Sequence, residues 1–504
     1  MDINRAKQEI KNSVRAYLAK DGDGSYLISS VRQRPILLMG PPGIGKTAIM
    51  EQAADECGIA LVSYTITHHT RQSAIGLPFI SKRIYGDKEY TITEYTMSEI
   101  IASVYDKMEE TGLREGILFI DEINCVSETL APTMLQFLQR KSFGSHFVPE
   151  GWVIVAAGNP PEYNKSVRDF DIVTLDRLKR IDVEDNFEVW KQYAYRNRIH
   201  PAVISYLEIK KQNFYTIETT VDGKVFVTAR GWEDLSNFLQ AYETLGLAAD
   251  EAVIAEYLQH PRIARDFAAY YDLFRKYRSD YHIEEILDGK MPASAVERLQ
   301  GAPFDERLSV IGLLIGRLTD DFADIYYNEL YVTHLYDALK SIKQSLTAAP
   351  LANQLEREAD TLRRALEARQ KASAVDRREA AAVTKAARTL DRYRLETETA
   401  LDRNTAFSEL SDRFQQEAGA LEQQIEAGSQ ALEHAFAFLE TAFGKSQELV
   451  VFVTELNTNF FSTQFIQENG SAAYSRNNKE LMIGKQRREL MQDISKLQDF
   501  LQGL

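Results

Sequence analysis

One short stretch limits the folds open to this chain more than any other feature. Residues 36–39 form an apolar run, and residues 40–47, GPPGIGKT, follow it directly. A continuous apolar run bounded by turn residues is typical of a strand that is buried on both faces. After Thr47 the apolar residues return at helical spacing. The sequence therefore predicts a strand, a tight glycine-rich loop and a helix in immediate succession.

The loop has the chemistry to hold phosphate. Its spacing fits G-x-x-x-x-G-K-[ST], in which backbone amides surround the phosphates of a nucleotide, the lysine reaches the β and γ groups, and the hydroxyl binds Mg²⁺. Thr47 is therefore a predicted metal ligand as well as a loop residue. The predicted phosphate-binding residues are Pro42, Gly43, Ile44, Gly45, Lys46, Thr47 and Ala48.

Two carboxylates follow a second apolar run, residues 117–120. Asp121 and Glu122 would emerge at the carboxyl end of that strand, where open α/β sheets place their ligands. We expect Asp121 to hold the metal, usually through water, and Glu122 to polarise the water that attacks the γ-phosphate. The alternative is that the pair only caps the N-terminus of a helix.

A third apolar run, residues 153–157, ends in small residues and then Asn159. The amide of Asn159 both donates and accepts hydrogen bonds, so it could orient the attacking water against the γ-phosphate. The alternative is an ordinary turn asparagine before Pro160.

Short apolar runs alternate with helical patterns only in the N-terminal part of the chain. That alternation indicates a parallel sheet with helices on its faces. With 504 residues the chain is too long for one core. We predict an α/β domain over 1–190, a mostly helical domain over 191–285 with a small hairpin around Asp222-Gly223, and an all-α domain with long helices over 286–504.

The C-terminal domain is expected to be a helical hairpin or bundle. A continuous two-chain coiled coil fits less well, because the apolar periodicity lapses between about residues 371 and 389 and again near 401–407. The apolar stretch 448–466 is expected to belong to a core rather than to an interface.

Composition excludes several classes of function. The formal net charge of −15 argues against a general affinity for nucleic acid or for anionic membranes. No apolar run is long enough to span a bilayer and the N-terminus lacks a signal-peptide core, so we expect a cytoplasmic protein without membrane insertion. Cys57 and Cys125 are expected to be reduced thiols without a chemical role.

Five motifs occur in an order that resembles AAA+ ATPases, most closely the MoxR group: GPPGIGKT, LFIDEIN, AAGNPPEYN, LDRLKRI and TARGWEDLS. The resemblance covers residues from about 30 to 285. It implies a five-stranded parallel αβα P-loop core with a helical lid, assembly into a ring that is usually a hexamer, and ATP at the subunit junctions. Many such proteins are chaperone-like remodellers, often beside a partner with a von Willebrand factor A domain.

The resemblance also implies roles for individual residues. Lys46 and Thr47 match the Walker A pair, Asp121 and Glu122 match the Walker B pair, and Asn159 matches the first sensor.

Two arginines complete the implied site. Arg177 falls where the family has an arginine that reaches the neighbouring subunit's γ-phosphate, although Arg180 or Arg168 could serve instead. Arg230 falls where the lid presents its second sensor to ATP in the same subunit.

Two further segments match features of the family. Residues 67–100 resemble an insertion that projects toward the ring pore and contacts clients. Within it, His68, His69 and Arg71 are candidate contacts, but adjacent histidines point in different directions, which disfavours a metal site. Residues 141–152 resemble a second hairpin, shorter here than in many relatives.

The expected function is therefore Mg²⁺-dependent hydrolysis of ATP by a ring that remodels protein complexes. Two alternatives stay open: a nucleic-acid-associated motor or loader, and a nucleotide-gated scaffold with little turnover. The choice of ATP over GTP comes from the resemblance alone.

Overall fold

The chain, in a computed structural model, packs into two compact units. Unit 1 comprises Met1–Val189, Thr228–Arg230 and Arg363–Ala380, and unit 2 comprises Trp190–Val227, Gly231–Leu362 and Ala381–Leu504. The residues that the structure describes are 1–68, 74–163, 170–221, 223–344, 350–371, 376–397 and 403–479. The predicted domain boundaries at 190 and 285 stay predictions.

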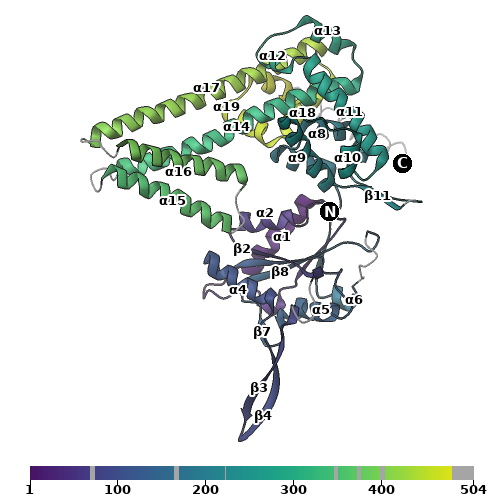
Figure 1. Ribbon diagram of the computed structural model, residues 1–504, viewed down its shortest axis with the longest axis vertical. Coiled ribbons are helices and arrows are strands. Elements are labelled where there is room, and N and C mark those ends of the chain that lie inside the picture. The colour runs from purple at the N-terminus through teal and green to yellow at the C-terminus, as the bar shows by residue number, and fades with distance from the viewer. Residues whose placement is uncertain are drawn as a thin grey trace, which may run out of the picture. The chain divides into compact units, whose positions relative to one another are not determined.

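Unit 1 is built on a five-stranded sheet in the order β2-β5-β8-β1-β9 (Figure 1). Every neighbouring pair in it is parallel. The strands are β1 (Ile36–Met39), β2 (Ala60–Thr65), β5 (Gly116–Asp121), β8 (Trp152–Gly158) and β9 (Lys179–Asp182). The predicted parallel αβα core is confirmed, and β1, β5 and β8 fall on the three apolar runs of the sequence.

Helices cover both faces of this sheet. Alternate strand residues, such as Leu118 and Ile154, pack in one core with Ile101 and Phe137 of the helices on that face. The other face is covered by α2, which contacts β2 and β5, and by α1, which packs on α2. The helices of unit 1 are α1 (Ile3–Leu18), α2 (Ala48–Cys57), α4 (Glu99–Thr111), α5 (Ala131–Arg140) and α6 (Ile172–Leu175).

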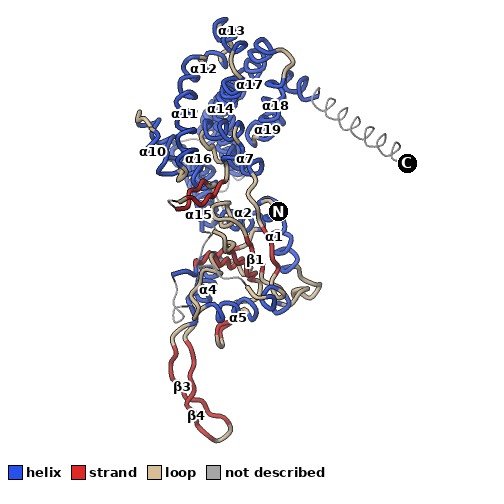
Figure 2. The backbone as a smooth tube through the Cα atoms, turned by 90° about the vertical axis from the view of Figure 1, so that its right-hand side faces the viewer, coloured by secondary structure: helices blue, strands red, loops and turns tan. Residues whose placement is uncertain are grey.

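Two antiparallel hairpins interrupt the parallel pattern of unit 1. The longer one joins β3 (Pro78–Tyr85) to β4 (Lys88–Tyr95) and extends away from the sheet, with its two strands drawn as the long red tube of Figure 2. It lies within the segment expected to be an insertion. The second hairpin joins β6 (Ser142–Phe143) to β7 (His146–Phe147) and is short, as expected.

Unit 2 begins with helices around an aromatic core. Tyr206, Trp232 and Phe267 are fully buried, and their ring centroids lie 5.2 to 5.6 Å apart. The hairpin of β10 (Thr216–Thr220) and β11 (Gly223–Val227) confirms the one predicted there. The helices are α8 (Pro201–Ile209), α9 (Ala229–Leu245), α10 (Glu251–Tyr257), α11 (Pro261–Asp280), α12 (Ile283–Leu287) and α13 (Ala293–Gly301), preceded by α7 (Phe187–Arg196).

Long helices make up the rest of the described chain, mostly within unit 2. They are α14 (Phe304–Gln344), α15 (Leu351–Lys371), α16 (Arg377–Thr397), α17 (Arg403–Phe443), α18 (Gln447–Thr458) and α19 (Phe460–Asn469). Helix α14 approaches α8 closely at Gly312 and Gly316, where an added Cβ would lie 2.6 Å from Ser205 Oγ and 2.5 Å from Pro201 Cγ. A side chain at either glycine would therefore force the two helices apart.

One end of this region is a four-helix bundle. Leu335 of α14, Leu355 of α15, Leu390 of α16 and Leu410 of α17 share one buried core. The predicted bundle is confirmed. The stretch 448–466 forms α18 and α19 and buries most of its apolar side chains, as expected of a core.

A buried ion pair connects the beginning and the end of unit 2. The Lys191 ammonium of α7 lies 2.7 Å from Glu455 of α18 and 2.8 Å from Glu208 of α8, and its side chain is only 2% exposed. The elements expected to form a lid therefore pack together with the C-terminal helices.

Among the described residues, none of the helices combines the length and the apolar character needed to cross a bilayer.

Candidate nucleotide-binding site

The carboxyl ends of three parallel strands meet at one edge of the sheet. Met39 at the end of β1 is in register with Gly158 at the end of β8, and Ile120 of β5 pairs with Ala156 of β8. The segments that follow these strands are therefore neighbours, although they are far apart in the sequence. They carry the predicted phosphate loop, the carboxylate pair and Asn159.

The loop between β1 and α2 requires its glycines. Gly43 and Gly45 have φ angles of 74° and 93°, which favour glycine over any residue with a side chain. At Gly40 an added Cβ would lie 2.6 Å from the Val183 carbonyl oxygen. Helix α2 begins at Ala48, so its first amides face the loop, where a phosphate is favoured.

Lys46 is the most buried charged group of the loop, at 8% exposed. Its ammonium donates to the carbonyl oxygens of Gly40 at 2.8 Å and Pro41 at 2.7 Å, and to Asn159 Oδ1 at 2.8 Å. Burial lowers the pKa of Lys46 to about 8, with Arg230 adding to the decrease and Asp121 opposing it. The lysine thus links the loop directly to the strand that carries Asn159.

Thr47 and Asp121 lie together, as the predicted metal site requires. The Thr47 hydroxyl donates to Asp121 Oδ2 at 2.9 Å. A hydroxyl beside a carboxylate is an all-oxygen donor set, which suits a hard cation such as Mg²⁺ that also binds nucleotide phosphates. Among the described residues, no group of three or more His, Cys, Asp or Glu side chains is arranged to hold a metal ion.

Glu122 has an unusual backbone. Its φ angle of 57° places it in the left-handed region, which is strained for a residue with a side chain. Its amide donates to Asp121 Oδ1 at 2.9 Å, so the two acidic residues constrain each other. Residues held in such conformations cluster at functional sites because the surrounding structure must enforce them.

Asn124 is a functional candidate that the sequence reasoning missed. Its side chain is 2% exposed and donates to the Asn159 carbonyl oxygen at 2.8 Å, while its Oδ1 accepts from the Asn159 amide at 3.3 Å. The signal was its place in IDEIN, three positions after Asp121, but nothing in the sequence shows that its side chain faces Asn159.

Arg230 lies beside the phosphate loop. Its amide donates to the Gly43 carbonyl oxygen at 3.3 Å, and its Cβ would lie 3.5 Å from a Cβ added at Gly43. Thr228 is closer still, with Oγ1 at 3.0 Å from the same point. Arg230, the expected second sensor, therefore belongs to unit 1, and its backbone contacts the loop that would hold phosphate.

Arg177 lies away from this group. It follows α6, is exposed, and donates to Gln139 Oε1 at 2.8 Å. Arg180 lies on the edge strand β9 and pairs with Asp182 at 2.7 Å. The third candidate, Arg168, is outside the described residues.

The remaining candidates are the two histidines and Arg71 within residues 67–100, and the two cysteines. His69 and Arg71 lie outside the described residues, and His68 ends a short 3-10 helix, Ile66–His68. Cys57 and Cys125 are free thiols, half-buried, as expected.

Comparison with known proteins agrees with the geometry of this unit. Residues 36–175 match the model of the ATPase family associated with various cellular activities (AAA). This span covers less than half of the chain. No curated protein matches the sequence. The family match, the sheet order and the phosphate loop together support an AAA+ ATPase domain in this part of the chain.

Proposed function

We propose that the chain is a Mg²⁺-dependent ATPase of the MoxR type that forms a ring, with six subunits expected, and remodels protein complexes beside a partner with a von Willebrand factor A domain. One observation carries the hydrolytic part: Lys46 contacts Asn159 while Thr47 contacts Asp121, at one edge of the sheet. The first pair joins a phosphate-binding cation to a water-orienting amide, and the second provides a metal site.

Each side chain of the site has a separate role in the hydrolysis of ATP. The loop amides and Lys46 bind and orient the β- and γ-phosphates, with Lys46 giving up its bonds to the loop carbonyls. Thr47 and Asp121 would hold Mg²⁺, which would neutralise charge that develops on the phosphates. Glu122 accepts a proton from the attacking water, and Asn159 holds that water in line. Arg230 senses the γ-phosphate within the same subunit.

Assembly into a ring would bring Arg177 to the next subunit's site. Two observations support an interface there. Arg177 is exposed, and two large apolar side chains just ahead of it, Ile172 and Val173, are 84% and 60% exposed. Large apolar side chains that are exposed together are typical of a protein contact surface. Their position beside Arg177 therefore supports an interface at that residue.

The hairpin of β3 and β4 supports a role in contacting another protein. Ile80 is 77% and Ile84 is 74% exposed on one of its faces, and Phe79 and Tyr85 are exposed on the other. An isolated two-stranded hairpin is only marginally stable in water. Apolar groups on both faces would gain stability by burial against a partner or client.

Phosphate release by purified protein with ATP and Mg²⁺ tests the proposal. The Glu122→Gln variant should bind ATP and assemble normally without turnover, because it keeps the shape of the site and loses the proton acceptor. Brisk hydrolysis by that variant would remove Glu122 from the mechanism. A wild-type protein that binds ATP without releasing phosphate would favour a nucleotide-gated scaffold.

The remodelling role needs a separate test. Because the Glu122→Gln variant is held in the ATP-bound state, a pull-down with it should recover the client and the von Willebrand factor A partner. A pull-down with the Lys46→Ala variant should recover neither. Stimulation of the ATPase by DNA, weakening with salt, would instead favour a nucleic-acid motor.

A further inference from the structure

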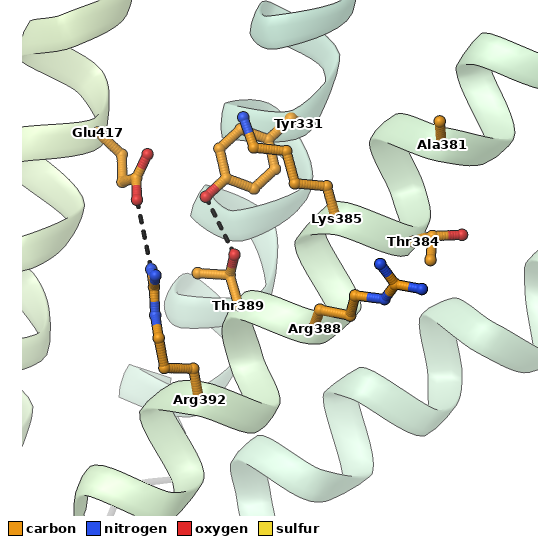
Figure 3. Close-up of a pocket in the computed structure, with 8 residues that line it drawn as sticks. All are labelled: Tyr331, Ala381, Thr384, Lys385, Arg388, Thr389, Arg392 and Glu417. Atoms are coloured by element: carbon orange, nitrogen blue, oxygen red, sulfur yellow. Dashed lines mark hydrogen bonds and ion pairs between the residues drawn. The ribbon is translucent and has the colours of Figure 1, made fainter.

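Unit 2 contains a hollow, lined in part by charged and hydroxyl-bearing side chains, that the proposed ATPase chemistry does not use. It lies between α14, α16 and α17 and has a volume of about 580 Å³ (Figure 3). This is within the range of roughly 300–1,000 Å³ that is typical of small-molecule sites. The side chains that line it and carry the argument are Tyr331, Lys385, Arg388, Thr389, Arg392 and Glu417.

Three of the lining residues are cations on one helix. Lys385, Arg388 and Arg392 are spaced three and four residues apart on α16, so they follow one another on one face. With a rise of 1.5 Å per residue, they cover roughly 10 Å of the helix axis. This is enough to contact several anionic groups of one ligand at once.

Only one lining carboxylate opposes these cations. Glu417 of α17 accepts from Arg392 at 3.4 Å, a long contact that both residues could give up. Arg388 makes no ion pair with any residue that the structure describes, and Figure 3 draws none for it. Three cations against one carboxylate leave two positive charges in excess, in a chain whose formal net charge is −15.

The rest of the hollow is held in place and has hydroxyl groups. Tyr331 is 2% exposed, and its hydroxyl lies 3.1 Å from Thr389 Oγ1. Lys385 is positioned by the same tyrosine, because its ammonium lies 3.9 Å from the centre of the ring and 3.3 Å from Asn328 Oδ1. The cation at one end and the hydroxyls of the floor are therefore fixed before any ligand binds.

We propose that this hollow binds a small molecule that carries several phosphate groups. Guanidinium groups match phosphate oxygens with paired N–H bonds, an ammonium adds a point charge, and hydroxyls donate to oxygens that remain. The lining residues of α16 span only 381–392, and this short extent favours a small ligand over an acidic segment of another protein, which would need a longer groove. The site is separate from the proposed ATPase site and does not depend on it.

Titration calorimetry with sodium tripolyphosphate tests the proposal. The full chain should carry Lys46→Ala, because the phosphate loop would otherwise bind the same probe. In that background Arg388→Gln should weaken binding about tenfold, since a charge-assisted hydrogen bond contributes about that much. Adding Lys385→Gln should weaken it further. The matched control is Arg357→Gln, which removes an exposed arginine of α15 outside the hollow and should leave the affinity unchanged.

Arg388 is exposed and makes no ion pair with a described residue, so its replacement should leave the fold intact and a loss of binding can be assigned to the site. Hydrogen exchange should show protection of residues 381–393 by tripolyphosphate. Equal affinity for the Arg388→Gln and Arg357→Gln proteins would overturn the proposal, as would protection confined to residues 40–48. Tighter binding of a polyglutamate peptide than of tripolyphosphate would also overturn it and assign the surface to an acidic protein segment.

Discussion

The side-chain amide of Asn124 forms hydrogen bonds with both backbone polar groups of Asn159. It donates to the Asn159 carbonyl oxygen at 2.8 Å and accepts from the Asn159 amide at 3.3 Å. The loop after β5 thereby fixes the loop after β8. Gly158 is required for this contact, because a Cβ there would lie 2.6 Å from Asn124 Oδ1. Asn124 is a positioning residue, acting on the reaction only through Asn159.

Asn124→Ala should therefore lower kcat much more than it changes KM for ATP. The change removes the partner of two part-buried backbone groups and frees Asn159 to move, which should cost about 1–3 kcal/mol of stability and about tenfold or more in kcat. Asn124→Asp should behave similarly, because a carboxylate cannot donate to the Asn159 carbonyl.

A buried asparagine elsewhere provides the control. Asn459 is fully buried, donates to Thr319 and accepts at the start of α19. Asn459→Ala should lose comparable stability while steady-state ATPase assays give an unchanged kcat. If both variants lowered kcat equally, the effect of Asn124 would be general destabilisation.

The backbone of Glu122 leads to a second prediction. Because φ is 57° there, a glycine should fit better than any residue with a Cβ. Glu122→Gly and Glu122→Ala both remove the carboxylate, so both should lack turnover. The glycine variant should nevertheless be more stable by up to about 1 kcal/mol, since relief of left-handed strain outweighs the entropy of a freer unfolded chain.

Urea unfolding of the two inactive variants measures this difference. A more stable alanine variant would show that the left-handed conformation is not maintained in solution.

The sequence predicted the sheet wherever strands are uniformly apolar. All four residues of β1 and all seven of β8 are buried, so each appears as an uninterrupted apolar run. Strand β9 was not located, because it is an edge strand with the sequence KRID, in which only Ile181 is buried. The hairpin of β3 and β4 has only a weak signal in the sequence, an alternation of apolar and polar residues around Gly86-Asp87.

The residues of the candidate site likewise fall into those that the sequence predicts and those that it does not. Residues with fixed spacing, such as Lys46 and Thr47, could be predicted because the loop motif is local. Asn124 could not, because its role depends on the packing of β5 against β8. The hollow beside α16 could not either, since the spacing of Lys385, Arg388 and Arg392 is also that of an ordinary solvated helix face. The hollow exists only because α14 and α17 pack beside α16.

The lowered pKa of Lys46 leads to a third prediction. Burial and Arg230 bring it to about 8, so above that pH the free protein holds Lys46 without its proton. Phosphate binding favours the charged form, so ATP binding should take up a proton there, and affinity should fall by up to tenfold per pH unit. Below that value affinity should be flat with pH.

Calorimetry in buffers of different ionisation enthalpy measures the proton taken up. Lys46→Arg is the control, because a guanidinium stays charged throughout this range and should show no break near pH 8. Wild-type affinity that stays flat between about pH 7 and about pH 10 would contradict the shift.

The position of Arg177 leads to the last prediction. Its guanidinium is exposed and donates to Gln139 Oε1 at 2.8 Å, while the following residue, Leu178, is 4% exposed and anchors the turn in the core. Arg177→Ala should therefore leave folding and ATP binding intact but lower kcat by on the order of 10³, as expected for an arginine supplied in trans.

Mixing separates this role from a structural one. A ring that combines Arg177→Ala with Glu122→Gln subunits contains some junctions where an intact Glu122 faces an intact Arg177, so ATPase activity should return although each variant is inactive alone. Arg180→Ala is the matched control. It should keep its activity, because Arg180 already pairs with Asp182 on β9. Mixed rings that stay inactive, together with loss of activity in Arg180→Ala, would transfer the role in trans to Arg180.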